Sequence, residues 1–213
     1  MAFFYDKIPN IIKRLFFNQV WDIPNTANTI YLTFDDGPTP EITEKVLEIL
    51  DKHQIKATFF CIGDNVRKYP EIVQKILSKH HSVGNHTYSH LKGWKTSTKT
   101  YISNTEACRI KLNSKFTIQN SQIFRPPYGK ITLWQSYKLR KLGYKIIMWD
   151  VLSKDYDASI SAEKCYENVL KNVSSGSIIV FHDSNKAKEN ILNSLEKTIE
   201  TLKSKGFKFE KIA

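Results

Sequence analysis

Residues 29–38 read TIYLTFDDGP, an apolar run that ends in two adjacent aspartates. Two similar runs follow, ATFFCI at 57–62 and SIIVF at 177–181. Short, continuous apolar runs are typical of strands that are buried on both faces, as in a parallel sheet. With the weaker candidates included, the pattern predicts strands at Thr29–Asp35, Lys56–Ile62, Ser82–His86, Gln122–Arg125, Tyr144–Asp150, Ser177–Asp183 and Phe207–Lys211.

Apolar residues recur at helical spacing between these runs. One predicted helix follows Thr39-Pro40, which would supply an N-cap and a proline at the first helical position. Another precedes Gly206, which can end a helix. Strands that alternate with helices predict βαβ units and a parallel sheet, and about seven repeats favour a closed or nearly closed barrel in a single domain. The helical positions are Ile42, Val46, Ile49 and Leu50 in the first case, and Ile191, Leu195, Ile199 and Leu202 in the second.

The first 28 residues are predicted to form a helical cap segment, separate from the barrel of residues 29–213. A helix carrying Ile8, Ile11, Ile12, Leu15 and Phe16 would cover one end of the barrel. Its basic residues would also suit a membrane surface, which is the weaker alternative.

Composition limits the classes of partner. The 213 residues suit one domain, and the formal net charge of +11 favours anionic partners such as nucleic acid, anionic lipid or acidic glycans. The basic residues are scattered over the helices without a Lys/Arg block, so nucleic-acid binding is not expected. The cysteines Cys61, Cys108 and Cys165 are odd in number and widely spaced, which predicts reduced thiols.

No apolar run approaches the roughly 18 residues that span a bilayer, so no transmembrane segment is expected. The N-terminal stretch MAFFYDKIPNIIKRLFF is interrupted by charges and has no small-residue cleavage site. We therefore expect a cytoplasmic protein, or one whose leader has been removed. The oligomeric state is left open.

Ionisable residues lie where the predicted strands end. Because parallel strands place their carboxyl ends on one rim of a barrel, several such residues together predict an active site there. The residues concerned are Asp35, Asp36, His86, Arg125, Asp150, His182 and Asp183.

His86 and His90 are four residues apart in HTYSH and would share one face of a helical turn. Spacing alone is weak, since two histidines can simply form hydrogen bonds within a loop. Asp36 would complete a set of two histidines and one carboxylate, which leaves positions on a cation open for water and substrate. Non-haem iron oxygenases use the same set, so the ligands alone do not select hydrolysis.

The residues next to these ligands are what favour hydrolysis over oxygen chemistry. The adjacent carboxylates of Asp35 and Asp36 repel each other unless a cation is present, and the one that is not a ligand could take a proton from water. Alternatively, both could cap the helix near Pro40. His182 could supply an acid, although a lone histidine beside a buried strand is more often a core residue. Two prolines follow Arg125 and would hold its guanidinium against a carboxylate.

Together these motifs resemble the polysaccharide deacetylases of carbohydrate esterase family four, which include nodulation-factor, chitin and peptidoglycan deacetylases. The resemblance extends from about Thr29 to Lys211. It rests on TFDDGP (33–38), HTYSH (86–90), RPPY (125–128) and VFH (180–182), which match the family's first, second, third and fifth motifs. In the last of these, Val180 replaces a leucine.

The resemblance implies an irregular seven-stranded (β/α) barrel and the removal of N-acetyl groups from a sugar or polysaccharide. It implies a divalent metal, usually zinc, with cobalt or nickel as alternatives. It also assigns roles: Asp36, His86 and His90 as metal ligands, Asp35 as base, Arg125 as its orienting partner, His182 as acid, and the backbone N–H of Tyr128 as an oxyanion donor.

The fourth motif departs from the family pattern D-x-x-D-W, because residues 152–156 read LSKDY. Asp155 keeps the carboxylate that should pair with His182, whereas Leu152 and Tyr156 replace the aspartate and the tryptophan. Trp94, Trp149 and Tyr156 could stack on a sugar ring, although each alone is more often a core residue.

The expected reaction is hydrolysis of an acetamide on an N-acetylated glycan. One alternative is an inactive carbohydrate-binding relative, but binding alone needs neither Asp35 as base nor His182 as acid. Another is an O-acetyl esterase. The sugar itself is not predicted, because the loops that select it vary within a fold.

Overall fold

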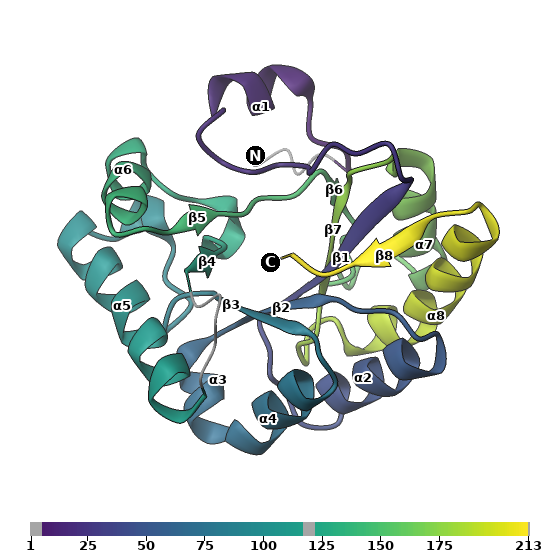
Figure 1. The fold of residues 1–213 in the computed structure, drawn as a ribbon, viewed down its shortest axis with the longest axis horizontal. Helices are drawn as coiled ribbons and strands as arrows, with labels where there is room; N and C mark the ends of the chain where they lie inside the picture. Colours follow the sequence, from purple (N-terminus) through teal and green to yellow (C-terminus); the bar gives the residue numbers. More distant parts are fainter. Residues whose placement is uncertain (1–5, 117–121, 213) are drawn as a thin grey trace.

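The computed structural model describes residues 6–116 and 122–212, and shows a single α/β domain with a parallel sheet (Figure 1). The strands run in the order β5-β4-β3-β2-β1-β7-β6, and β8 pairs with the start of β1. The predicted fold class is thereby confirmed: the sheet curls into a partial barrel inside a ring of helices. The strands are β1 (Thr29–Asp35), β2 (Thr58–Cys61), β3 (Ser82–Asn85), β4 (Ile123–Phe124), β5 (Lys145–Ile146), β6 (Val151–Leu152), β7 (Ile178–His182) and β8 (Lys208–Glu210).

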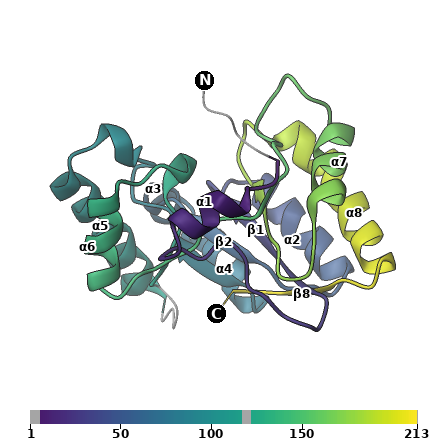
Figure 2. The same cartoon turned by 90° about the horizontal axis from the view of Figure 1, so that it is seen from above.

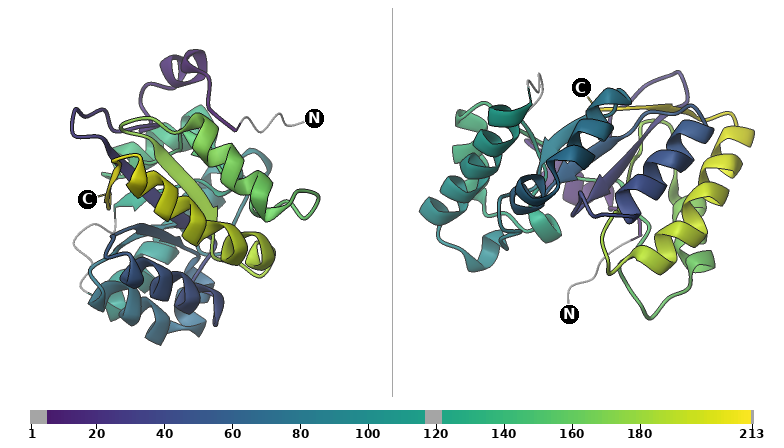
Figure 3. Two further views of the ribbon diagram at one scale, coloured as in Figure 1. Left: turned by 90° about the vertical axis from the view of Figure 1, so that its right-hand side faces the viewer. Right: turned by 90° about the horizontal axis from the view of Figure 1, so that it is seen from below.

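The helices other than α1 cover the outer face of the sheet, and α7 and α8 pack side by side with α2 next to α8 (Figure 3). They are α1 (Asn10–Leu15), α2 (Ile42–Lys52), α3 (Gly63–Lys68), α4 (Pro70–Ser78), α5 (Thr98–Lys115), α6 (Leu133–Lys141), α7 (Ala162–Asn172) and α8 (Lys188–Ser204), with short 3-10 turns η1 (Gly93–Lys95) and η2 (Pro127–Gly129).

The ends of β1 agree with the prediction, but two other boundaries were wrong. Helix α2 is capped by Glu41 through a capping box with Glu44, so it does not start at Thr39-Pro40. Of the fifth predicted strand, Tyr144–Asp150, only Lys145–Ile146 forms a strand, β5, and the unpredicted strand β6 begins just after the predicted range.

The N-terminal segment explains this break, because it pairs with the chain between β5 and β6. The Val20 N–H donates to the Ile146 carbonyl at 2.8 Å, and the Ile8 N–H donates to the Asp150 carbonyl at 2.9 Å. In Figure 1, α1 lies at the top of the view, above β5 and β6, and Figure 2 shows the same helix from above. The segment therefore closes the gap between the two edge strands.

The apolar row expected in this segment packs only in part. Ile8 is buried and Ile12 packs against the core, whereas Ile11 and Leu15 are 62 % and 68 % exposed. Residues 1–5 of the proposed cap segment lie outside the described residues, as do 117–121 and 213 of the proposed barrel. The division at residue 28 stays a prediction. No helix in the described part of the chain is both long and apolar enough to cross a membrane.

Strand β1 positions the site at the centre of the sheet. Phe34 and Phe59, on neighbouring strands, stack at 4.9 Å between ring centroids and anchor β1 in the core. In register, Asp35 lies opposite His182 on β7 and opposite Phe60 on β2. The carboxyl ends of β1 and β7 therefore present an aspartate and a histidine side by side.

Candidate active site

The ionisable residues surround a pocket of about 520 Å³ at the carboxyl ends of the strands. Most of the side chains singled out in the sequence line it: Asp35, Asp36, His86, His90, Tyr128, Trp149, Leu152, Tyr156 and His182. Arg125 and Asp155 lie behind this wall, each bonded to one of the lining residues. The structure thus brings together all eight residues of the predicted site.

Asp36, His86 and His90 form one ligand group, with their candidate ligand atoms within 4.8 Å of one another. The Oδ1 atom of Asp36 is 3.0 Å from Nε2 of His90 and 3.5 Å from Nε2 of His86. His86 places its Nδ1 2.8 Å from the Arg125 carbonyl, so Nδ1 carries a proton and Nε2 is the ring nitrogen turned toward Asp36. This donor set fits a divalent cation such as zinc.

The two histidines are not on a helical turn, contrary to expectation. Their segment is a loop in which Thr87 and His90 have φ values of 61° and 53°. Asn85 accepts a hydrogen bond from the Thr87 N–H at 2.9 Å, and Asn104 accepts one from the Tyr88 N–H at 2.9 Å. Sequence analysis missed both asparagines. Asn85 directly precedes the motif, whereas Asn104 carries no local signal because it is brought in by α5.

The adjacent aspartates point to different partners, which is how they coexist. The Asp36 carboxyl would have its pKa raised by burial, but hydrogen bonds from His86 and His90 hold that pKa well below its ordinary range. Asp35 instead pairs with Arg125. The alternative that both aspartates cap the helix near Pro40 is therefore wrong, since α2 takes its cap from Glu41.

Arg125 is fully buried and fixes the Asp35 carboxylate. Its Nη1 donates to Asp35 Oδ1 and to Thr33 Oγ1, both at 2.7 Å. Its Nη2 donates to the Met148 carbonyl at 2.8 Å, and its guanidinium lies 4.2 Å from the centre of the Phe60 ring. A buried cation with its donors satisfied in this way is rigid. Sequence analysis missed Thr33, although it lies in the same strand as Asp35.

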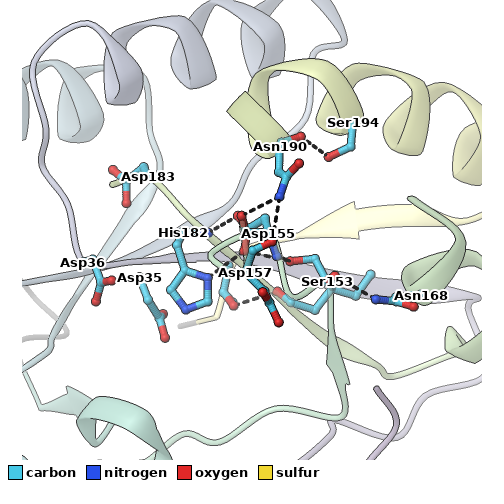
Figure 4. Close-up of polar contacts among 12 residues, drawn as sticks. Asp35, Asp36, Ser153, Asp155, Asp157, Asn168, His182, Asp183, Asn190 and Ser194 are labelled. Atoms are coloured by element: carbon cyan, nitrogen blue, oxygen red, sulfur yellow. Dashed lines mark hydrogen bonds and ion pairs between the residues drawn. The ribbon is translucent and has the colours of Figure 1, made fainter. Parts of the chain in front are cut away.

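His182 is held from behind by Asp155. Its Nδ1 lies 2.8 Å from Asp155 Oδ1, and its backbone N–H donates to the other oxygen at 2.7 Å. Burial lowers the pKa of His182, but the Asp155 charge and hydrogen bond outweigh it and raise the pKa to about 9. Ser153 donates to Asp155 Oδ1 at 3.0 Å, and Asn190 donates to the Asp155 carbonyl at 3.1 Å (Figure 4). The contact with Asp155 therefore favours the protonated form of the imidazole that faces the pocket.

Two carboxylates of the predicted rim serve the fold instead. Asp150 forms ion pairs with Lys7 and Lys13 of the N-terminal segment. Asp183 accepts hydrogen bonds from the Gly37 N–H and the Thr43 hydroxyl. Neither lines the pocket.

The three aromatic residues proposed to stack on a sugar differ in whether they line the pocket. Trp149 and Tyr156 line the pocket, and so does Leu152 at the position where the family pattern has aspartate. Trp94 is 64 % exposed, does not line the pocket, and donates its indole N–H to the Ile131 carbonyl at 3.1 Å. Tyr128 has a φ of 60° within η2, and its ring lies 4.6 Å from that of His90.

Comparison with known proteins agrees with this geometry. The family model described as polysaccharide deacetylase matches residues 22–147, more than half of the chain. The chain belongs to the polysaccharide deacetylase family. As a member, it is a hydrolase that acts on carbon–nitrogen bonds other than peptide bonds.

Relatives with assigned activities match most of the chain. A peptidoglycan-N-acetylglucosamine deacetylase of Bacillus cereus is 33 % identical, covering 89 % of this chain and 88 % of its own. A chitooligosaccharide deacetylase of Azorhizobium caulinodans is 34 % identical, covering 78 % of both. Among solved structures, a peptidoglycan N-acetylglucosamine deacetylase in complex with 4-naphthalen-1-yl-N-oxidanyl-benzamide superposes with a TM-score of 0.86 at 34 % identity, covering 92 % of this chain and 91 % of that one.

Proposed function

We propose that this polysaccharide deacetylase hydrolyses the acetamide of N-acetylglucosamine units in a glycan, with a divalent cation held by Asp36, His86 and His90. The observation that carries the proposal is the convergence of this ligand group, the Asp35–Arg125 pair and the His182–Asp155 pair on one pocket. The names of the two relatives support acetylated glucosamine as the target. Zinc is the proposed ion, with cobalt or nickel as substitutes.

When bound, the cation would lower the pKa of a water molecule and polarise the acetyl carbonyl. Asp35 then acts as the base for the attacking water. Arg125 donates to Asp35 Oδ1 at 2.7 Å, so the second oxygen of the carboxylate is the one left to receive the proton. The backbone N–H of Tyr128, in the turn beside His90, donates to the oxyanion that develops on the acetyl oxygen.

His182 completes the reaction as the acid. Asp155 keeps its ring protonated and oriented, and the proton passes to the nitrogen of the leaving amine as the carbon–nitrogen bond breaks. Acetate and a free amino sugar are the products. Asp35 and His182 lie opposite each other in the register of β1 and β7, so base and acid approach the acetamide from one face of the sheet edge.

Acetate release tests the proposal. The chain is stripped with a chelator, reloaded with Zn²⁺ or Co²⁺, and assayed on N-acetylglucosamine oligomers, peptidoglycan and O-acetylated xylan. We expect acetate from the N-acetylated substrates, and only with metal. His90→Gln should lose both metal and activity. His80→Asn, an exposed histidine outside the pocket with a left-handed backbone that asparagine tolerates, serves as the matched control.

Other outcomes would contradict the proposal in distinct ways. Acetate from xylan alone would make the protein an O-acetyl esterase. Full metal loading with no acetate from any substrate would make it an inactive glycan-binding relative.

A further inference from the structure

A second groove lies on the outside of the molecule, against α5 and α6, and shares no lining residue with the strand-end pocket. The two helices pack side by side at the edge of the molecule opposite α7 and α8 (Figures 1 and 2). The groove has a volume of about 640 Å³ and no acidic residue in its lining. Its charged and apolar lining residues are Lys99, Lys138, Lys141, Ile102, Trp134 and Leu142.

The helical repeat of α6 places aromatic rings and lysines on one outward face. Trp134, Tyr137, Lys138 and Lys141 are spaced three, four and seven residues from the first of them, and side chains at these spacings are neighbours on a helix. The Trp134 and Tyr137 rings stack at 5.2 Å between centroids. The Lys138 Nζ lies 4.9 Å from the centre of the Trp134 ring, and the Lys141 Nζ lies 5.7 Å from that of Tyr137. We call these four side chains the α6 face.

Large apolar side chains are exposed on and beside the α6 face. Trp134 and Tyr137 are 56 % and 40 % exposed, and Leu133 and Leu142, at the two ends of the helix, are 73 % and 49 % exposed. Single exposed apolar side chains are ordinary on a protein surface, but several of them gathered on one helix mark an interaction site.

This surface is also positively charged. Helix α6 has no aspartate or glutamate, and α5 has a single one, Glu106. That carboxylate is already engaged, because Arg109 and the Tyr144 hydroxyl both donate to it, at 2.6 Å and 2.5 Å. The lysines of the groove therefore face outward without a carboxylate from either helix to neutralise them. A partner that carries negative charge fits them.

The chemistry of the α6 face favours an anionic lipid surface over a glycan. Tyr137 and Lys138 already lie against the Trp134 ring, so stacking a sugar on that ring would compete with both. A sugar would also leave the exposed leucines without an apolar partner. Indole and phenol rings at the level of the lipid headgroups, with lysine ammonium groups at the phosphates, are the usual composition of a membrane-binding surface.

We infer that the α6 face docks onto an anionic phospholipid surface. Leu133, Trp134 and Leu142 enter the headgroup region, and Lys138 and Lys141 contact the lipid phosphates. Apolar burial and charge attraction both contribute to such binding, so its affinity depends on the content of anionic lipid and on salt. This inference goes beyond the proposed function, because it concerns a surface outside the catalytic pocket.

Co-sedimentation of the full chain with vesicles tests the inference. We expect vesicles of phosphatidylglycerol mixed with phosphatidylcholine to bind at least about tenfold more tightly than vesicles of phosphatidylcholine alone, with a difference that shrinks as salt is raised. Lys138→Gln combined with Lys141→Gln should weaken binding to the anionic vesicles about tenfold. Lys164→Gln combined with Lys171→Gln removes the same charge from α7 and should bind like the wild type.

Tryptophan fluorescence locates the contact. Brominated lipid in the anionic vesicles should quench the emission of the wild-type protein, because the bromine atoms lie next to an inserted indole. The quenching should be largely lost in Trp134→Phe. It should be kept in Trp94→Phe, which removes another exposed indole from outside α6.

Several outcomes would overturn the inference. One is the absence of binding to anionic vesicles, or equal binding to both kinds of vesicle. Another is unchanged binding in the double variant of Lys138 and Lys141. If Phe17→Ser, in the exposed N-terminal segment, loses binding while the α6 variants keep it, that segment is the membrane contact. Fluorescence changes with N-acetylglucosamine oligomers or glycerol phosphate, but not with vesicles, would make the groove a site for a soluble ligand.

The test is independent of acetate release. The α6 variants should deacetylate a soluble oligosaccharide as fast as the wild type does, because none of the substituted residues lines the catalytic pocket. Vesicle binding without acetate release would sink the proposed function alone, and acetate release without vesicle binding would sink this inference alone.

Discussion

Three side chains of the candidate site, Asp35, His182 and His86, are each held by a second residue from a distant part of the sequence. Arg125 fixes Asp35, Asp155 fixes His182, and the Arg125 carbonyl orients His86. Proton transfer depends on such orientation, because a base or acid that rotates away loses most of its effect. Substitutions of Asp35 and of Asp155 distinguish the loss of a proton-accepting group from the loss of the residue that orients the acid.

Asp35→Asn should abolish turnover while leaving the metal in place. The amide keeps the size of the side chain but cannot accept the proton, so we expect kcat to fall about 1000-fold or more. Metal content, measured by elemental analysis, should stay near that of the wild type because Asp35 is directed to Arg125 and not to the ligand group. Loss of the metal in this variant would place Asp35 among the ligands and leave the base unassigned.

Asp155→Asn should move the alkaline limb of the rate profile to lower pH. The Asp155 charge raises the pKa of His182 to about 9 against the opposing effect of burial. Without that charge the pKa falls, so the acid form is lost at a lower pH and the maximal rate drops. The pH dependence of kcat measures this. Asp157→Asn, a neighbouring aspartate bonded to Ser159, is the matched control, and an equal shift there would remove Asp155 from its assigned role.

At the scale of single elements, the turn η2 controls the pocket wall. It carries Tyr128, and Gly129 follows with a φ of 64°. A Cβ on Gly129 would lie 2.5 Å from the Trp149 ring, which no relaxed structure permits. The turn and the indole that lines the pocket are therefore fitted to each other.

Gly129→Ala should reduce kcat/KM at least about tenfold, because the turn and Trp149 must move apart and a left-handed alanine costs about 1 kcal/mol. Kinetics with tryptophan fluorescence would detect both effects. Gly206→Ala is the control, since its φ is 81° but its Cβ would meet nothing closer than 3.8 Å. That variant should lose about 1 kcal/mol in urea unfolding and keep its activity. Similar activity in the two variants would contradict the role of the turn.

At the scale of the whole molecule, the N-terminal segment is tied into the sheet by charge. Asp150 is buried and pairs with Lys7 and Lys13, and it accepts a hydrogen bond from Ser177 at 2.5 Å. Burial raises the pKa of Asp150, but these partners outweigh it and lower that pKa. The stabilisation is therefore present above the ordinary carboxyl pKa and is lost as the pH falls through the lower pKa of the folded state.

Lys13→Met should destabilise the protein by about 2 kcal/mol near pH 7, since the buried Asp150 carboxylate loses one of its cations. Urea unfolding measures the loss, which should shrink below about pH 4 as the carboxylate becomes protonated. Lys52→Met removes a cation from an exposed pair with Glu196 and should change stability little. A loss that stays constant with pH would show that packing of the lysine stem, and not its charge, is responsible.

The sequence by itself determined the fold class, the ends of β1 and the choice of the eight residues that the structure brings together at the candidate site. Burial on both faces leaves a continuous apolar run, which is a local signal, and the motif residues are read one by one. It also pointed to an arginine held against a carboxylate, because two prolines follow Arg125.

Only the tertiary structure decided which residues meet. The loop that places His86 and His90 depends on side chains of Asn85 and Asn104. Asp150, which was expected at the pocket, pairs with the N-terminal segment instead. Lys92 and Lys186 are ordinary surface lysines in the sequence, yet they flank one pocket. Such contacts join residues far apart along the chain and follow no period, so no local pattern records them; they are decided when the strands take their register and bring those side chains together.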